Sequence, residues 1–384
     1  MNIGMVCYPS HGGSGVVATE LSKQLSKRGH QVHLISFSLP LRISQRHDNI
    51  WFHRVEVSAY PLFKYPPYSL EVTAMIADVA KNHLLDLVHV HYAIPHGMSA
   101  WCAQVMLAEE GIRLPFVTTL HGTDITVVGS EPSMAPVTCF ILRHSDAVTT
   151  VSKWLAEETR RFFQVHRELD VIPNFIDTAA FKRRPTPGFR DCLATPGEKL
   201  LLHISNFRPV KNVPDIVNAF AAIQREIPCR LTMVGDGPER QHVEQLVRSL
   251  GLSARVHFAG TQANVMDFLS VADLYLMASE TESFGLSALE AMSCGVPVVA
   301  YRVGGMPEVI QHGETGLFAE PHDVAGLARA ATELLTDPPR QRRMARAARR
   351  RAMERFTVGA IVPMYEQVYD RVTRGGRPTP VCLF

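Results

Sequence analysis

Short apolar runs alternate with segments of helical periodicity through the first half of the chain. Residues 2–7 and 31–36 are apolar and rich in β-formers, and residues 14–28 between them have the spacing of a helix that Gly29 closes. Strand, helix and strand in this order form a βαβ unit with parallel strands. The same alternation predicts strands at 87–91, 116–121 and 147–151, with helices at 70–83 and 96–110. We expect a parallel sheet with helices on both faces.

The pattern stops at a polar stretch rich in Pro and Gly, between residues 173 and 199, and then starts again. Strands are predicted at 200–206, 230–234, 256–259, 274–277 and 296–301, and helices near 213–226, 238–250 and 285–293. The sequence thus predicts a first domain over 1–172, a linker over 173–198 and a second domain over 199–356. The expected fold class is α/β, with two doubly wound, Rossmann-like domains that face a cleft. Ligands are expected at the carboxyl ends of the strands.

Composition excludes several classes of protein. The 384 residues are 46% hydrophobic and 20% charged, with a formal net charge of +2, so no bulk charge points to nucleic acid. No apolar run approaches the ~18 residues of a membrane span, and the N-terminal residues do not read as a signal peptide. The seven cysteines include no C-x-x-C pair, which indicates reduced thiols. We expect a cytoplasmic protein without a membrane partner.

Two carboxylates flank the start of a predicted helix in the second domain. Gly285 releases the chain from a loop, so Glu282 lies before the helix and Glu290 inside it. Eight helical residues at ~100° each would turn the two side chains roughly 80° apart, which favours two different ligand groups. Backbone N–H groups at a helix start favour a phosphate, and the carboxylates can accept from hydroxyls. The alternative is a capped, half-buried helix with surface Glu.

A loop after the first strand of the second domain carries two cations. Arg208 and Lys211 follow Ser205 and Asn206 and stand three residues apart, so they can neutralise a diphosphate as it leaves. An ordinary charged surface loop is the other interpretation. Gly-rich turns at 235–238 and 304–308 could both be architectural, and the glycine pair at 304–305 could also line the phosphate site.

In the first domain, glycines at 12, 13 and 15 follow the first strand and open a helix, so backbone amides can approach a phosphate or carboxylate. The spacing is not G-x-G-x-x-G, which argues against a nicotinamide site. His121 ends a predicted strand and could donate to a sugar hydroxyl or steady charge near the anomeric carbon, although a strand-end His is often structural. His89 and His91 share a strand face without a third ligand at suitable spacing, so no metal is expected.

Taken in order, Gly-Gly-Ser-Gly, His-Gly-Thr-Asp, Asn-Phe-Arg-x-x-Lys, Gly-Asp-Gly-Pro and Glu-x7-Glu resemble retaining glycosyltransferase family 4, which has the GT-B fold. The resemblance spans nearly the whole chain. Within that family, segments 7–15, 63–68, 91–96 and 118–126 look like the enzymes of bacillithiol biosynthesis that join N-acetylglucosamine from UDP-GlcNAc to L-malate.

The resemblance implies roles for individual residues. Arg208 and Lys211 would contact the diphosphate, Glu290 the ribose, and Glu282 the sugar hydroxyls, with His121 beside the transferred sugar. The implied catalytic residues are His121, Arg208, Lys211 and Glu282. The implied donor-binding residues are Gly13, Gly15, Asn206, Arg208, Lys211, Ser283, Phe284, Gly285, Leu286 and Glu290. The implied acceptor-binding residues are Ser14, Tyr92, Thr119 and Arg208.

The resemblance also implies retention by front-face attack, no cofactor, no essential metal, and a homodimer. Residues 357–373 would form a helix that crosses back to the first domain, followed by a flexible tail at 374–384. Three alternatives stay open: transfer to another small acceptor, 2-epimerisation of UDP-GlcNAc by the same fold, and a non-catalytic sensor of nucleotide sugars. For the arginine-rich stretch 340–355, a solvated helix face is favoured over a nucleic-acid or membrane patch.

Overall fold

In the computed structural model the chain divides into two compact units, one of residues 1–174 with 359–384 and one of residues 175–358. The structure describes residues 1–9, 12–40, 43, 47–56 and 67–374. Part of the 63–68 segment and all but the first residue of the expected tail lie outside these ranges. Among the described residues, no helix is long and apolar enough to cross a membrane.

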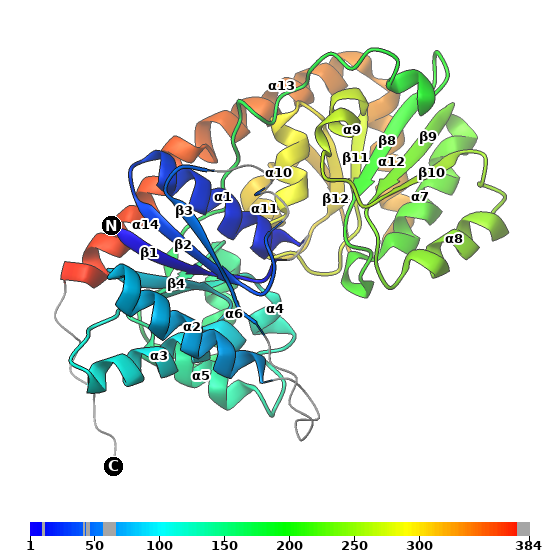
Figure 1. The fold of residues 1–384 in the computed structure, drawn as a ribbon. Coiled ribbons are helices and arrows are strands. Elements are labelled where there is room, and N and C mark those ends of the chain that lie inside the picture. The colour runs from blue at the N-terminus through cyan, green and yellow to red at the C-terminus, as the bar shows by residue number, and fades with distance from the viewer. Residues whose placement is uncertain (10–11, 41–42, 44–46, 57–66, 375–384) are drawn as a thin grey trace. The chain divides into compact units, whose positions relative to one another are not determined.

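Unit 1 is built on a seven-stranded sheet with the order β3-β2-β1-β4-β5-β6-β7, in which all strand pairs are parallel. Its elements are β1 (Asn2–Val6), α1 (Gly13–Lys27), β2 (Gln31–Ser36), β3 (Ile50–Arg54), α2 (Tyr68–His83), β4 (Leu87–His91), the π-turn η1 (Ala93–Gly97), α3 (Met98–Glu109), β5 (Phe116–Leu120), α4 (Thr123–Thr126), α5 (Ala135–His144), β6 (Ala147–Thr150), α6 (Lys153–Phe163), β7 (Asp170–Val171) and α14 (Val358–Arg374). Figure 1 shows α2, α3 and α5 on one side of this sheet, with α1 and α14 on the other.

Unit 2 is built on a six-stranded parallel sheet with the order β10-β9-β8-β11-β12-β13. Its elements are η2 (Arg190–Cys192), β8 (Lys199–Ile204), η3 (Pro209–Lys211), α7 (Val213–Glu226), β9 (Cys229–Val234), α8 (Arg240–Ser249), β10 (Val256–Gly260), α9 (Met266–Val271), β11 (Leu274–Met277), α10 (Leu286–Ser293), β12 (Val298–Tyr301), α11 (Met306–Val309), β13 (Gly316–Ala319), α12 (Val324–Thr336) and α13 (Pro338–Arg355). Buried aliphatic side chains of β8, β9 and β11 pack against α7 and α12 to form its core.

The proline-rich segment expected to be a linker folds with unit 2 from residue 175 onward. Arg184 pairs with Asp267 at 2.7 Å, and Arg190 pairs with Asp273 at 2.7 Å. Arg190 also donates to the carbonyl of Glu198 at 2.9 Å. Ion pairs and backbone contacts of this kind attach the segment to the domain, which its composition does not reveal.

Helix α14 packs on unit 1 although it follows unit 2 in the chain. Glu366 accepts hydrogen bonds from Arg28 at 2.7 Å and lies 3.1 Å from the ring of His30. Tyr369 is fully buried, and its hydroxyl lies 2.7 Å from Nδ1 of His89 on β4. The last described helix is therefore part of the first domain's fold.

Candidate active site

The strand order of each sheet decides which loops meet. In unit 1 the order reverses between β1 and β4, and in unit 2 it reverses between β8 and β11. The connections from such neighbouring strands leave on opposite faces, so a crevice opens beyond their carboxyl ends. The glycine turn follows β1, and Tyr92 follows β4; the Arg208–Lys211 loop follows β8, and Glu282 follows β11. The sequence-predicted residues thus gather at the two places where α/β sheets bind ligands.

The loop after β8 is anchored by one buried aromatic ring. Phe207 is fully buried in the unit 2 core, with a positive φ of 38°. This anchor leaves Arg208 exposed and starts the single turn η3, which ends at Lys211. Asn206 lies beside it, and its buried Oδ1 has no hydrogen-bond partner among the described residues. The loop therefore presents two cations and one unsatisfied acceptor.

Lys211 and Glu282 form an ion pair across the β8–β11 boundary. The Lys211 Nζ lies 2.5 Å from Glu282 Oε1, and Ser279 Oγ donates to the same oxygen at 2.9 Å. The two charged side chains are 22% and 11% exposed, so they are partly shielded but still reach solvent. A cation held by one carboxylate oxygen keeps N–H donors for a second anion. The pair therefore has the chemistry to donate to an anion through Lys211 and to accept from a hydroxyl through Glu282.

The backbone of the Glu282 loop packs closely against Gly304 and Gly305. Gly304 has a φ of 52°, and a Cβ built on it would lie 2.1 Å from the carbonyl oxygen of Glu282. Gly305 N donates to that same carbonyl at 2.8 Å. The glycine pair thus fixes the Glu282 loop, which supports the architectural interpretation of this turn.

Helix α10 begins directly after this loop without a side-chain cap. Gly285, its N-cap, has a φ of 90°, and a Cβ there would meet the sulfur of Met306 at 2.4 Å. Phe284 is 3% exposed and packs edge-on against Phe356, with ring centroids 5.6 Å apart. Within the described part of the chain, no side chain caps the first N–H groups of α10, so they can donate to another acceptor. Glu290 lies one to two turns into the helix and is 5% exposed.

Sequence reasoning missed a support beneath the cationic loop. His203 is buried and bonds to the carbonyl of Leu276 at 3.0 Å and to Ser205 Oγ at 2.8 Å. Burial lowers the pKa of His203 to about 4; the hydrogen bond to the Leu276 carbonyl opposes that shift, and the charge of Lys211 adds to it. The neutral ring holds Ser205 in place, and Gly235 fits against the Ser205 carbonyl, where a Cβ would come within 1.8 Å. A strand-interior histidine gives no sequence signal for this role.

In unit 1, the helix α1 starts beside Tyr92. Gly12 caps it without a side-chain hydrogen bond, and Ser14 Oγ donates to the Tyr92 hydroxyl at 2.8 Å. Tyr92 has a φ of 84°, which re-aims the chain at the end of β4. Gly13 is exposed and Gly15 is buried. The structure therefore joins Ser14, Tyr92 and the N–H groups of α1, as a site for a small anion requires.

His121 lies next to Tyr92 and is not charged at neutral pH. Its Nε2 is 2.8 Å from Nδ1 of His91, and its ring packs edge-on against Tyr92 at 5.3 Å. Burial lowers the pKa of His121 to about 3, so it is a neutral hydrogen-bonding group rather than a cation. Its loop is held by Asp124, whose Oδ1 accepts from the N–H groups of His121 and Gly122 at 3.0 and 2.9 Å.

Asp124 was not among the predicted site residues. Its other oxygen accepts from Ala93 N at 3.2 Å, so one buried carboxylate ties the loop after β5 to the loop after β4. Burial raises its pKa to about 6, and the backbone donors oppose that shift. The Asp in the His-Gly-Thr-Asp motif was the available signal, because Asp commonly accepts from nearby backbone N–H groups.

Thr119 lies inside the sheet rather than at its edge. It is fully buried, and its hydroxyl bonds to Nε2 of His89 at 2.6 Å and to Thr149 Oγ1 at 2.5 Å. Both contacts are made on strands, so its side chain supports the sheet beneath α14. The acceptor-binding role of Thr119 remains a prediction that these contacts do not favour.

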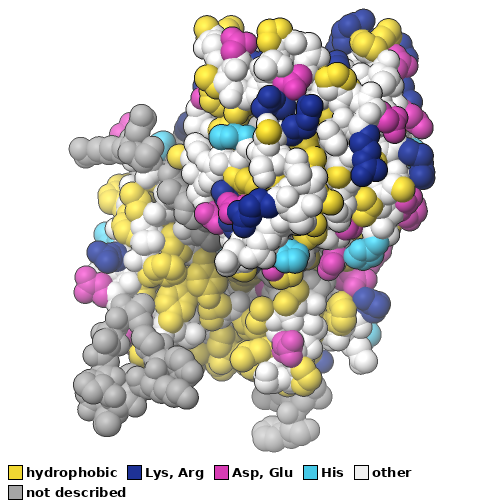
Figure 2. Space-filling view, turned by 90° about the vertical axis from the view of Figure 1, so that its right-hand side faces the viewer, with side chains coloured by type: hydrophobic (Ala, Val, Ile, Leu, Met, Phe, Trp, Pro, Cys, Tyr) yellow, Lys and Arg dark blue, Asp and Glu magenta, His cyan; other side chains and the backbone are white. Residues whose placement is uncertain are grey.

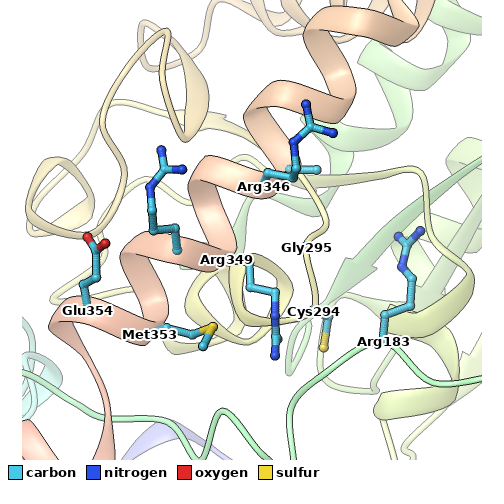
Figure 3. A pocket seen from close by; sticks show the side chains of 9 residues that line it. Arg183, Cys294, Gly295, Arg346, Arg349, Met353 and Glu354 are labelled. Atoms are coloured by element: carbon cyan, nitrogen blue, oxygen red, sulfur yellow. The ribbon is translucent and has the colours of Figure 1, made fainter.

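The arginine-rich helix α13 borders a separate cavity in unit 2 of about 600 Å³. In Figure 3, Arg349 points toward Cys294, whereas the guanidinium of Arg346 points away from it. Arg351 donates to the backbone carbonyls of Val309 and Glu308 at 2.7 and 2.8 Å. On the face in Figure 2, basic side chains are interspersed with acidic ones. Arg349 and Arg351 thus donate to backbone carbonyls of unit 2, and the solvated face expected of the other arginines stays a prediction.

Comparison with known proteins adds to this geometry. Residues 11–180 match the family model described as Glycosyltransferase Family 4, and residues 189–351 match the one described as Glycosyl transferases group 1. Over 375 residues the sequence is 48% identical to the N-acetyl-alpha-D-glucosaminyl L-malate synthase of Bacillus anthracis, covering 97% of this chain and 98% of that one. The chain belongs to glycosyltransferase family 4. It is an enzyme of the hexosyltransferase class.

Other relatives of this glycosyltransferase differ in their acceptors. It is 32% identical over 310 residues to the glycogen synthase of Mycobacterium tuberculosis, covering 77% of this chain and 71% of the relative. It is 27% identical over 406 residues to the D-inositol 3-phosphate glycosyltransferase of Rhodococcus erythropolis, covering 96% and 89%.

Solved structures confirm the GT-B fold expected from the sequence. The sucrose-phosphate synthase of Thermosynechococcus elongatus superposes with a TM-score of 0.81 at 23% identity, covering 97% of this chain and 98% of that one. The Anabaena protein HepE, solved with UDP and glucose, gives 0.79 at 23% identity, covering 98% and 100%. At this level of identity the likeness establishes the fold of the glycosyltransferase, and its substrates are a separate question.

Proposed function

We propose that this glycosyltransferase moves N-acetylglucosamine from UDP-GlcNAc to the hydroxyl of L-malate, a step of bacillithiol biosynthesis. The observation that carries the proposal is the Lys211–Glu282 ion pair in front of the uncapped start of α10. Its setting suits a sugar diphosphate, because a cation, a carboxylate and free helix N–H groups stand within one loop cluster. The 48% identity to the malate synthase of Bacillus anthracis supports this donor and acceptor.

On the donor side, Lys211 and the exposed Arg208 are assigned to the diphosphate. Their attraction grows as the bond between sugar and phosphate breaks and negative charge accumulates on the leaving UDP. Glu282 is assigned to the sugar hydroxyls, together with Ser283 and the N–H groups at the start of α10, because both contacts given for its carboxylate within the described residues are made by Oε1. Glu290 is assigned to the ribose. Asn206 is assigned to UDP-GlcNAc as well, because its buried Oδ1, which has no partner among the described residues, can accept a hydrogen bond from that ligand.

On the acceptor side, the start of α1 is assigned to a malate carboxylate. The helix dipole and the N–H groups near Gly13 favour an anion, and the hydroxyls of Ser14 and Tyr92 supply short polar contacts. The assignments of Arg208 to a second carboxylate and of His121 to the transferred sugar come from the resemblance and stay predictions. Thr119 is assigned to positioning, since its hydroxyl is used inside the sheet.

In the proposed reaction, the bond between the anomeric carbon and the UDP oxygen breaks as the malate hydroxyl oxygen bonds to that carbon. The hydroxyl proton passes to the departing phosphate, so the products are UDP and the N-acetylglucosaminyl malate. Attack from the face of the departing phosphate retains the anomeric configuration and needs no nucleophile from the protein. The proposed reaction assigns the role of metal ligand to none of these residues.

The test is mass spectrometry of the purified protein incubated with UDP-GlcNAc, with and without L-malate, in the presence of EDTA. Malate-dependent formation of N-acetylglucosaminyl malate with UDP supports the proposal. Formation of UDP-N-acetylmannosamine without an acceptor would establish the epimerase instead, and product with inositol phosphate or another sugar alone would replace malate. Donor binding without any turnover would support the sensor.

Three further expectations belong to the same proposal. NMR of the product tests retention, because the coupling of the anomeric proton distinguishes α from β linkage. Light scattering after gel filtration tests the homodimer expected from the family. Cell fractionation tests the cytoplasmic location. Activity that disappears in EDTA and returns with a divalent ion would contradict the expected independence from metal.

A further inference from the structure

Three histidines that the proposed reaction does not use converge on one face of the unit 1 sheet. His33 is on β2, His53 is on the edge strand β3, and His83 is the last residue of α2. The strands are parallel and His33 is paired with Trp51, so His53, two residues further along, projects from the same face. The end of α2 then brings His83 over both rings.

The three rings are in mutual contact. Their centroids lie 4.4 Å apart for His33 and His83, 5.1 Å for His33 and His53, and 5.1 Å for His53 and His83. Nδ1 of His33 is 2.9 Å from Nε2 of His53, and one ring nitrogen from each residue lies within 4.8 Å of the others. Nitrogens bound to one tetrahedral Zn²⁺ at about 2.0–2.1 Å are roughly 3.3 Å apart, so small side-chain rotations close this set around an ion.

One ring nitrogen of His33 has no hydrogen-bond partner among the described residues. His33 is 2% exposed, and its Nε2 is buried without a partner there, while its Nδ1 is already engaged by His53. A buried polar atom without a partner costs free energy and calls for a ligand or another explanation. The nitrogen of His33 that faces His53 is Nδ1, and it is the atom that can ligate an ion shared by the two rings.

The protonation of the cluster suits metal binding. Burial, together with charge on His83 and His53, lowers the pKa of His33 to about 4. Burial also lowers the pKa of His53, with Asp78 on α2 opposing that shift. Both rings are therefore neutral at pH 7, which is the form that ligates metals.

We propose that His33, His53 and His83 form a binding site for one Zn²⁺ ion. Three imidazole ligands suit zinc and its neighbours copper, nickel and cobalt, whereas Mg²⁺ and Ca²⁺ require oxygen ligands. His83 is the exposed member, so the ion enters from solvent and a water completes the coordination. The bound ion ties the edge strand β3 to the end of α2, which stabilises this part of unit 1 independently of the transfer reaction.

The experiment uses the full chain without an affinity tag, stripped with EDTA and dialysed. Zn²⁺ is titrated in by calorimetry, and Co²⁺ is used as a visible probe of tetrahedral coordination. We expect one Zn²⁺ per chain in the wild type, and His83→Ala should weaken its affinity ten-fold or more. His83 is exposed, so this variant should fold, and His53→Gln provides a second removal of one ligand. His166→Ala, an exposed histidine elsewhere in unit 1, is the matched control and should bind like the wild type.

The thermal transition provides a second readout. At one Zn²⁺ concentration, the Tm of the wild type and of His166→Ala should rise by similar amounts, and that of His83→Ala should rise less. Absence of stoichiometric binding in the wild type overturns the proposal, as does equal affinity in the wild type and His83→Ala. Because neither readout uses turnover, the result stands whether or not the proposed transfer to malate is found.

Discussion

Removing the charge of Lys211 should slow transfer far more than it destabilises the fold. The Lys211 Nζ lies 2.5 Å from Glu282 Oε1, and Glu282 keeps Ser279 at 2.9 Å when the lysine is replaced. In Lys211→Ala the carboxylate therefore stays in place without its counter-ion, close to where we place the diphosphate. The variant loses one charge-assisted contact to the leaving group, worth about 1.5–3 kcal/mol. At ~1.36 kcal/mol for each ten-fold change, kcat/KM should fall roughly 10- to 150-fold.

The effect on stability should be small because the pair is partly exposed. Ion pairs of this kind contribute about 0–1 kcal/mol after solvent screening, which corresponds to at most ~4 °C in Tm for a unit of this size. Glu282→Gln keeps the cation and loses only the charge on the acceptor, so its loss of kcat should be smaller, about ten-fold. The double variant should fall short of the product of the two single losses, because the residues share one contact.

The assay is steady-state release of UDP at saturating malate, with thermal denaturation of every variant in parallel. Lys182→Ala, which removes an exposed lysine of the same unit, is the matched control and should stay within two-fold of the wild type. The reasoning fails if Lys211→Ala and Glu282→Gln both retain kcat within two-fold. It also fails if their loss follows a comparable loss of folded protein.

Other predictions concern the loops and the buried network. Gly304→Ala should destabilise the protein by about 1–3 kcal/mol and lower kcat, because the residue has a φ of 52° and a Cβ would lie 2.1 Å from a backbone carbonyl oxygen. Thermal denaturation measures the loss of stability. The control is Gly359→Ala, because a Cβ at that position has no heavy atom of the described residues within 4 Å. Asp124 has a pKa raised from 3.8 to about 6 in the fold, so its contribution to stability is fully present below about pH 4 and is lost as pH rises through 6. Denaturation at a series of pH values should show that decline, of ~3 kcal/mol at most, in the wild type and not in Asp124→Asn. Thr119→Val should lower the Tm and leave the KM for malate within two-fold, because the Thr119 hydroxyl is bonded inside the sheet. Ser14→Ala should raise the KM for malate several-fold. If Thr119→Val instead raises this KM and leaves the Tm unchanged, Thr119 binds the acceptor.

Much of the fold follows from hydrophobic periodicity. The strands at 87–91 and 274–277 and the helix at 213–226 agree with the structure residue for residue, because short buried runs rich in β-formers and a strong amphipathic face each favour one secondary structure. The edge strand β3 and the strand β13 were not predicted. β3 is short and only partly buried, so its alternation is weak, and its pairing with β2 supplies the missing stabilisation.

The sequence predicted individual residues of the candidate site, but it did not predict which of them contact one another. The motifs placed Lys211 and Glu282 at strand ends, but their pairing depends on β8 lying next to β11. Thr119 was predicted as an acceptor-binding residue from its motif, and the motif gave no sign that its hydroxyl is also bonded to His89 within the sheet. The position of Asp124 in the motif did not reveal that its carboxylate bonds to both the loop after β4 and the loop after β5.

The sequence alone determined the two Rossmann-like domains and the family, because these depend on local periodicity and on motifs with fixed spacing. Tertiary structure alone decided which distant residues touch. The ion pair Lys211–Glu282 arises from neighbouring strands, and the cluster of His33, His53 and His83 arises from strand register and the end of a helix. Both rest on contacts between residues far apart in the chain, which no local pattern encodes, so only the folded sheet brings their chemistry together.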